Sequence, residues 1–333
     1  MNLSTTGHVE QWQHSVIRAT NTYVLFCQIC FGCTGNVLNL NVLLSRNMRS
    51  RTNLIFAVMA FADLFFLFTH IPQFLFFCGV LHSSQRYRNS IHLIKGVQNW
   101  FSAISIWCMM YATIERVQVL RSPFRTSRRS VSPRFIAIIT IIVIGALAVT
   151  ALQFLPPSQN IPSHVAETLL GLHVVSVVFV PFVVLTLLST LLVLALKKNT
   201  MPVHMLKDSQ TQQTLLVARN KTERKVTIMV TVIIISFIIC NAPGAILSFQ
   251  SKFQKIRGSE RSKDVTIAMI SSISNSLVIT GKVLNFVLFC MSSEHFRALL
   301  RSQLVSAFDC SNITRRSSCR SATKTYSIPL HDL

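Results

Sequence analysis

Two opposite charges, Asp63 and Lys282, lie within long apolar stretches of this 333-residue sequence. An ionisable group inside the hydrocarbon core of a membrane is costly, so each one is a functional candidate. Asn285 follows Lys282 by three residues and shares its helix face, and Asn36 and Ser105 lie at comparable depth in two further stretches. Because polar groups in a dry interior need partners, we predict one central polar network of these five residues. The alternative is a set of unrelated polar residues in separate helix contacts.

A second charged group follows the third apolar stretch, where Glu115 precedes Arg116. Glu223 lies 20 residues before Pro243, which is roughly 30 Å along a helix and therefore level with Arg116. An Arg–carboxylate pair that joins two helix ends can act as a latch with two states. The alternative is two solvated charges in a basic loop region.

A third group of polar side chains lies toward the other end of the same stretches. Membrane helix bundles hold ligands in cavities between their helices, so these side chains are predicted to line a ligand pocket. The predicted lining comprises Gln73, Gln98, Asn99, Ser102, His173, Asn241, Ser248 and Asn275.

The elements that must position these groups are apolar helices. The sequence is 50% hydrophobic and only 13% charged, whereas a soluble domain carries about a quarter charged residues. A helix that crosses the hydrocarbon core needs about 20 predominantly apolar residues, and seven stretches meet this length. They are Thr22–Leu44, Asn53–Val80, Gly96–Ile114, Phe135–Pro156, Thr168–Leu196, Val226–Phe249 and Val265–Met291. We therefore predict an all-α membrane protein with a seven-transmembrane helix bundle.

The net charge of +21 is distributed unevenly between the two sides of these stretches. Of the 32 Lys and Arg residues, 22 lie in segments on one side and nine on the other, while Lys282 lies within a stretch. The basic side is predicted to be cytoplasmic and the N-terminus extracellular. The charge then serves topology and contact with anionic lipid rather than nucleic-acid binding.

Several short motifs follow one another in order along these stretches. They are Gly35-Asn36, Ala62-Asp63, Glu115-Arg116, Pro181, residues 240–243 (CNAP) and residues 285–290 (NFVLFC). In order and spacing they resemble the signature residues of rhodopsin-like G-protein-coupled receptors. Residues 284–297 look most like invertebrate FMRFamide-type peptide receptors and related orphan receptors. The resemblance covers nearly the whole chain and implies a receptor that binds an extracellular ligand and a cytoplasmic G protein.

The resemblance also implies roles for individual residues. The central network holds a sodium ion in many relatives, and Arg116 with Glu223 forms the inner latch. The helix pivots and switch positions are Pro181, Phe237, Asn241, Pro243 and Phe289. Residues 293–303, with Phe296, Leu299 and Leu300 on one face, are similar to a short amphipathic eighth helix on the inner membrane surface.

Two departures from the family pattern bear on function. Asn241 replaces an aromatic switch residue, and Phe289 and Ser189 replace two tyrosines. Lys282 is unusual at its depth, and we hypothesise that its ammonium takes the place of sodium by pairing with Asp63. A lysine also occurs in this span of retinal-binding opsins, but one turn nearer the outer side, where this chain has Ile279.

The expected organisation is an extracellular N-terminus (1–21), a receptor domain with the eighth helix (22–303) and a cytoplasmic tail (304–333). Asn2 is a candidate for glycosylation and Cys310 for palmitoylation, and the Ser/Thr-rich tail is a candidate arrestin site. We expect a plasma-membrane receptor for a short neuropeptide, with no cofactor, metal, nucleic acid or enzymatic activity. The alternatives are a chemosensory receptor for a small molecule, a non-signalling seven-helix protein and a transporter.

Overall fold

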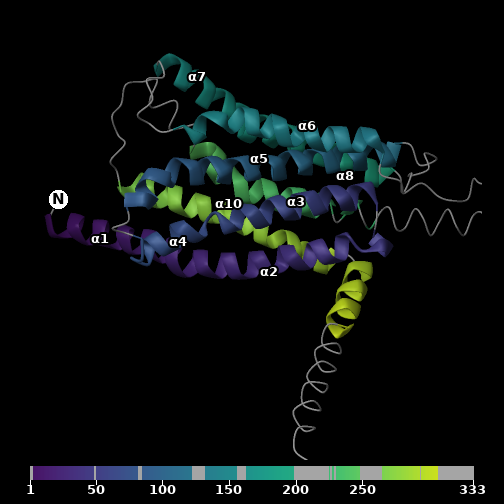
Figure 1. The fold of residues 1–333 in the computed structure, drawn as a ribbon, viewed down its shortest axis with the longest axis horizontal. Helices are drawn as coiled ribbons and strands as arrows, with labels where there is room; N and C mark the ends of the chain where they lie inside the picture. Colours follow the sequence, from purple (N-terminus) through teal and green to yellow (C-terminus); the bar gives the residue numbers. More distant parts are fainter. Residues whose placement is uncertain are drawn as a thin grey trace, which may run out of the picture.

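The described part of the chain is almost entirely helical and contains no strand (Figure 1). The computed structural model describes residues 3–48, 50–81, 85–121, 132–155, 163–198, 225, 227–228, 230–247, 265–292 and 294–306. The first half contains α1 (Leu3–Ala19), the π-helical turn η1 (Thr20–Val24), α2 (Leu25–Leu43), η2 (Arg46–Met48), α3 (Arg51–Phe68), α4 (Ile71–Phe77) and α5 (Gln85–Arg121). The second half contains α6 (Pro133–Thr150), η3 (Ala151–Phe154), α7 (Ser163–Val174), the π-helical turn η4 (Val175–Phe179), α8 (Val180–Lys198), the helix Val230–Leu247, α10 (Val265–Ser292) and the helix 294–306.

Local sequence signals set the starts of two of these helices. The Ser50 hydroxyl accepts a hydrogen bond from the Asn53 backbone N–H and caps the N-terminus of α3. Ser132 caps α6 in the same way through Phe135, and Pro133 occupies the first helical position, where its missing N–H is not needed. Both helices therefore begin where the serine satisfies an otherwise orphan donor.

Six helices in the described residues are long and apolar enough to cross a membrane. They are His8–Leu43, Arg51–Phe77, Pro133–Thr150, Gly171–Leu194, Val230–Leu247 and Val265–Met291. The remaining predicted span, Gly96–Ile114, lies within α5, which is longer at 37 residues but less apolar on average. In Figure 1, α5 runs between α3 and α6, and it also packs against α8. A helix surrounded by other helices faces less lipid and can carry more polar residues.

The first helix differs from the sequence prediction. The N-terminal 21 residues were expected to precede the first span, whereas α1 begins at Leu3 and continues through η1 into α2. Its carboxamides at positions 13, 21 and 28 are spaced by about two turns and share one face. Gln13 donates to Thr266, Asn21 to Ser272 and Gln28 to the Ser276 hydroxyl, at 2.7–3.0 Å. These bonds fasten the extended first helix to α10.

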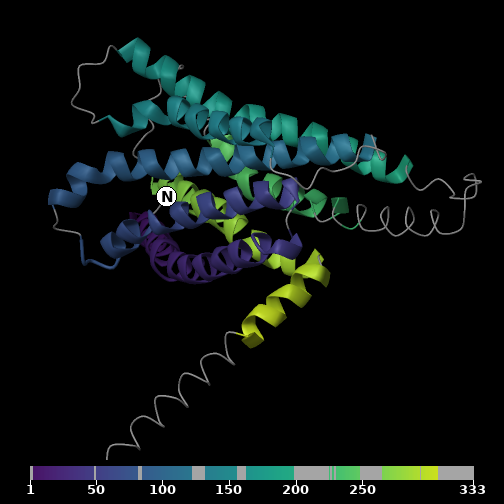
Figure 2. The ribbon, with the colours of Figure 1, turned by 45° about the vertical axis from the view of Figure 1, so that its right-hand side comes forward.

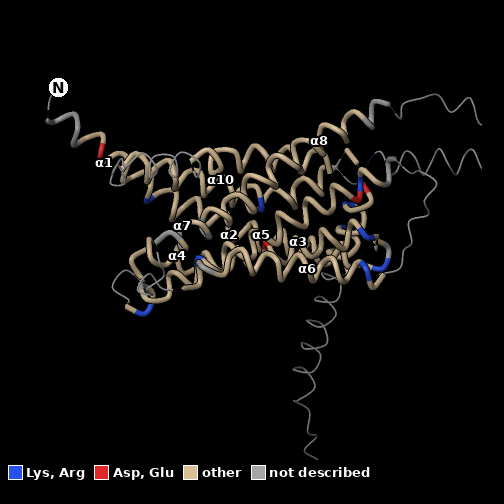
Figure 3. Tube along the Cα trace, turned by 90° about the horizontal axis from the view of Figure 1, so that it is seen from above, with Lys and Arg blue, Asp and Glu red and all other residues tan. Residues whose placement is uncertain are grey.

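The two ends of the bundle differ in charge. Figure 3 shows Lys and Arg gathered mainly at one end, with few charged residues between the ends. Arg46, Arg51, Arg116 and Arg134 belong to that end, where α2 and α5 finish and α3 and α6 begin. These described basic residues at the helix ends thus lie together at one end of the bundle.

The predicted eighth helix is present over residues 294–306 and turns away from the bundle axis after α10 (Figure 2, yellow). Phe296 is fully buried, and Leu299 and Leu300 pack against the same apolar core. Arg297 donates to the carbonyls of Cys290 and Met291 and so satisfies the C-terminus of α10. One apolar face and one capping arginine fix the angle of this helix.

Candidate functional site

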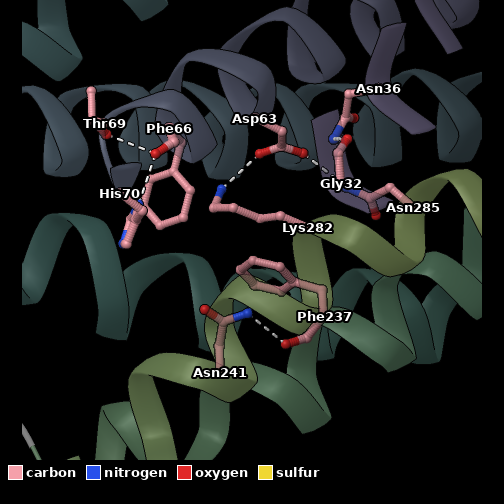
Figure 4. Close-up of polar contacts among 10 residues, drawn as sticks. All are labelled: Gly32, Asn36, Asp63, Phe66, Thr69, His70, Phe237, Asn241, Lys282 and Asn285. Carbon is pink, nitrogen blue, oxygen red and sulfur yellow. Dashed lines mark hydrogen bonds and ion pairs between the residues drawn. The ribbon is translucent and has the colours of Figure 1, made fainter. Parts of the chain in front are cut away.

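A buried ion pair lies in the middle of the bundle (Figure 4). The Lys282 Nζ is 2.7 Å from Asp63 Oδ1, and Asn285 Nδ2 donates to Asp63 Oδ2 at 2.9 Å. The side chains of Asp63 and Lys282 are 0% and 7% exposed. Because water does not reach these side chains, each charge is compensated by the other. The contact between Lys282 and Asp63 is the one hypothesised from the sequence.

Helix periodicity brings these three residues together. Lys282 and Asn285 lie three residues apart on α10 and so point toward the same facing helix. That helix is α3, and Asp63 lies near its middle. Close contact of the neighbouring helices depends on small residues, because a Cβ at Gly35 would lie only 2.8 Å from the Cβ of Phe286.

Asn36 and Ser105 were predicted to join this network. Both are buried, at 1% and 4% exposure, but in the described residues neither hydrogen-bonds to Asp63. Asn36 Nδ2 instead donates to the Gly32 carbonyl of its own helix, and its Oδ1 has no partner. Lys282 and Asn285 each donate to one oxygen of the Asp63 carboxylate. In the described residues, the side chains that hydrogen-bond to one another around Asp63 therefore come from α3 and α10.

A cavity of about 640 Å³ opens between the helices on the N-terminal side of the ion pair in α10. It lies at the end of the bundle opposite the basic end. Residues of the first helix, of α10 and of helices between them in the chain line it. Seven of the polar residues predicted for a ligand pocket line it: Gln73, Gln98, Asn99, Ser102, His173, Asn241 and Asn275. The eighth, Ser248, lies outside the described residues. The structure thus brings seven of the eight predicted residues to one cavity.

The cavity also has polar lining residues that sequence reasoning missed. They are Thr20, Asn21, Gln28, His70, Tyr87, Lys95, Ser272 and Ser276. His70 follows Asp63 by seven residues, so it lies on the same face two turns farther out. Asn21 and Gln28 show the same spacing along the first helix. A single step of seven residues from the predicted polar positions finds His70, from Asp63, and Lys95, from Ser102, but not the others.

Carboxamides dominate the polar lining of the cavity. Gln73 donates to Asn21, Gln98 to the Thr69 carbonyl, and Asn99 hydrogen-bonds to Gln153. Of the described lining residues, Lys95 alone carries a permanent charge, and none is Asp or Glu. Burial raises the pKa of the Tyr87 phenol, which lies beyond the apolar part of α5 and stays a neutral hydroxyl. The described lining therefore offers no carboxylate to pair with an amine.

At the basic end, Arg116 is buried at 7% exposure. Its Nε donates to the Thr52 hydroxyl at 3.0 Å, and its Nη2 contacts the same oxygen. The neighbouring Glu115 accepts a hydrogen bond from Tyr111 at 3.3 Å. Glu223, the predicted latch partner, lies outside the described residues. In this arrangement Arg116 joins α5 to the start of α3.

The predicted pivot and switch residues lie in helices that flank the ion pair and the cavity. Pro181 is the second residue of α8, just after the π-helical turn η4, and as a proline it donates no N–H to that turn. Pro243 lies within the helix Val230–Leu247, where Asn241 Nδ2 donates to the Phe237 carbonyl. Phe289 is 1% exposed and packs on Phe56 and Phe296, with ring centroids 5.1 and 5.6 Å apart. Asn2 and Cys310 lie outside the described residues.

Comparison with known proteins supports the same assignment. Residues 35–288 match the family described as "7 transmembrane receptor (rhodopsin family)". A candidate G-protein-coupled receptor of Caenorhabditis elegans is 27% identical over an alignment of 339 positions, which covers 90% of this chain and 74% of that protein. Residues 35–288 contain the ion pair, Arg116 and most of the residues that line the cavity. The chain therefore belongs to the rhodopsin family of seven-transmembrane receptors and has G-protein-coupled receptor activity.

Proposed function

We propose that this receptor lies in the plasma membrane with its N-terminus outside the cell and is activated by a short extracellular peptide. The peptide end enters the cavity of about 640 Å³, and a heterotrimeric G protein binds at the end of the bundle that carries Arg116. Arrestin binds the Ser/Thr-rich tail after its phosphorylation, in the segment 307–333 beyond the described residues.

The distribution of basic residues supports this orientation. Lys and Arg gather at the end of the bundle opposite the cavity (Figure 3). Positively charged segments remain on the cytoplasmic side during membrane insertion. The cavity then opens toward the outside, where an extracellular ligand reaches it.

The carboxamide lining is the observation that carries the peptide proposal. Each Asn or Gln side chain offers a donor and an acceptor, as each peptide unit does. Asn275 lines the cavity and makes no hydrogen bond with the other described residues, so its carboxamide is available to a ligand. The volume is within the range of roughly 300–1,000 Å³ found for ligand sites, which suits a few peptide residues.

A small chemosensory compound is the second candidate, because the same volume holds a whole small molecule. The two proposals differ in which chemistry activates the receptor. Cells that express the receptor with promiscuous G proteins are treated with a library of three- to eight-residue peptides and with a library of small metabolites and odorants. Activation by peptides supports the first proposal. Activation by small molecules alone contradicts it.

Asn275→Leu is expected to raise the half-maximal concentration of an active peptide about tenfold, the effect of losing one hydrogen bond in a desolvated site. Dose–response curves for G-protein activation measure this change. Thr190→Val is the matched control, because Thr190 lies exposed on α8 and its hydroxyl donates to the Thr186 carbonyl of its own helix. Equal half-maximal concentrations for Asn275→Leu and the control would contradict the proposal that the peptide binds in this cavity.

A further inference from the structure

One aromatic ring lies between the ligand cavity and the buried ion pair. Phe66 lines the cavity and is 6% exposed. The Lys282 Nζ lies 4.7 Å from the centroid of the same ring, and Asp63 precedes Phe66 by three residues on α3. A single side chain thus contacts the cavity and the ammonium together.

Neighbouring groups hold this ring in place. The His70 ring packs against Phe66 with 4.5 Å between centroids, and His70 Nδ1 is 2.8 Å from the Phe66 carbonyl oxygen. Because a carbonyl only accepts, Nδ1 carries the proton and Nε2 is left as an acceptor. Leu67 and Ile279 complete a small apolar cluster with Phe66. The floor of the cavity on this side is therefore well packed.

We propose that Phe66 is a positioning residue that couples occupancy of the cavity to the Lys282–Asp63 ion pair. The inference rests on the proposed function only in that a ligand occupies this cavity. The sequence motifs assign Phe66 no such role. Asn241, at the position of the family's aromatic switch, has no ring to do this.

The coupling follows from the electrostatics of the ammonium. Desolvation strengthens the attraction between a cation and an aromatic face, and Lys282 is almost fully buried. Figure 4 shows the Lys282 side chain between Phe66 on α3 and Phe237 on the helix Val230–Leu247. A ligand that displaces the Phe66 ring removes one of the contacts holding the ammonium on Asp63. The two helices α3 and α10 then favour a second packing arrangement against each other.

A double-mutant cycle tests the proposal. Phe66→Leu keeps an apolar side chain but removes the ring, and it is made in the wild type and in the neutral background Asp63→Asn/Lys282→Met. In the wild type we expect agonist-independent G-protein activation to rise about tenfold, the effect of losing one desolvated cation–π contact. In the neutral background we expect no such rise, because the cation is gone. The melting temperature of the purified receptor is expected to show the same dependence on background.

Ile279→Val is the matched control, since Ile279 lines the same cavity and packs in the same cluster. Its effect on melting is expected to be equal in both backgrounds. An equal effect of Phe66→Leu in both backgrounds, or no effect in either, overturns the proposal. Neither measurement uses a ligand, so failure of the peptide proposal leaves this result readable.

Discussion

Lys282→Met is expected to destabilise the receptor by about 3–5 kcal/mol, the cost of leaving one charge of a buried ion pair without its partner. Asp63 is fully buried and would keep only the hydrogen bond from Asn285. The melting temperature of the purified receptor and its abundance at the cell surface measure the loss. We expect both to fall steeply.

The neutral pair provides the control for this prediction. Asp63→Asn combined with Lys282→Met leaves no charge at this site and is expected to recover most of the lost stability, because both groups of the pair become neutral. Arg18→Met removes an exposed charge from the first helix and is expected to change stability by no more than about 0.5 kcal/mol. A double variant as unstable as Lys282→Met would mean that the two charges do not act as a pair.

Arg116→Ala is expected to abolish agonist-stimulated G-protein activation while the receptor still reaches the cell surface. Arg116 is the buried cation at the basic end, and its contact with Thr52 ties α5 to α3. An arginine held by a hydroxyl can exchange that contact for one with a partner protein. Nucleotide exchange on a purified G protein measures the loss directly.

Thr52→Val tests the contact that ties Arg116 to α3 separately from the part that Arg116 plays in G-protein coupling. It removes the acceptor but keeps the arginine, so we expect agonist-independent activation to rise about tenfold, the effect of one hydrogen bond to a charged group. Arg134→Ala removes an exposed charge from the same end and is the matched control. Full signalling by Arg116→Ala would contradict the assignment of this arginine to G-protein coupling.

The sequence predicted the bundle because the membrane imposes strong constraints on composition. Apolar stretches of sufficient length identify the spans, and a charged residue inside one of them requires a partner. Lys282 and Asp63 were paired by this reasoning, and the structure brings them to 2.7 Å. Membrane depth therefore gave more information about this site than any single motif.

The sequence could not predict which polar neighbours actually bond. Asn36 and Ser105 lie at the right depth, but hydrogen bonds depend on side-chain rotamers and on the donors already present. The start of the first helix was also missed, because the polar face of residues 8–21 is balanced by hydroxyls on α10 that lie some 250 positions away in sequence. Such long-range partners are visible only once the helices are packed.

The Lys282 ammonium lies 2.7 Å from Asp63 and serves as its internal counter-ion, where the family resemblance predicts a sodium ion. The most direct measurement is the melting temperature of the purified wild-type receptor in sodium chloride and in choline chloride at equal ionic strength. We expect the same melting temperature in both salts, because the Asp63 carboxylate already has its cation. A melting temperature that rises specifically with sodium would contradict it.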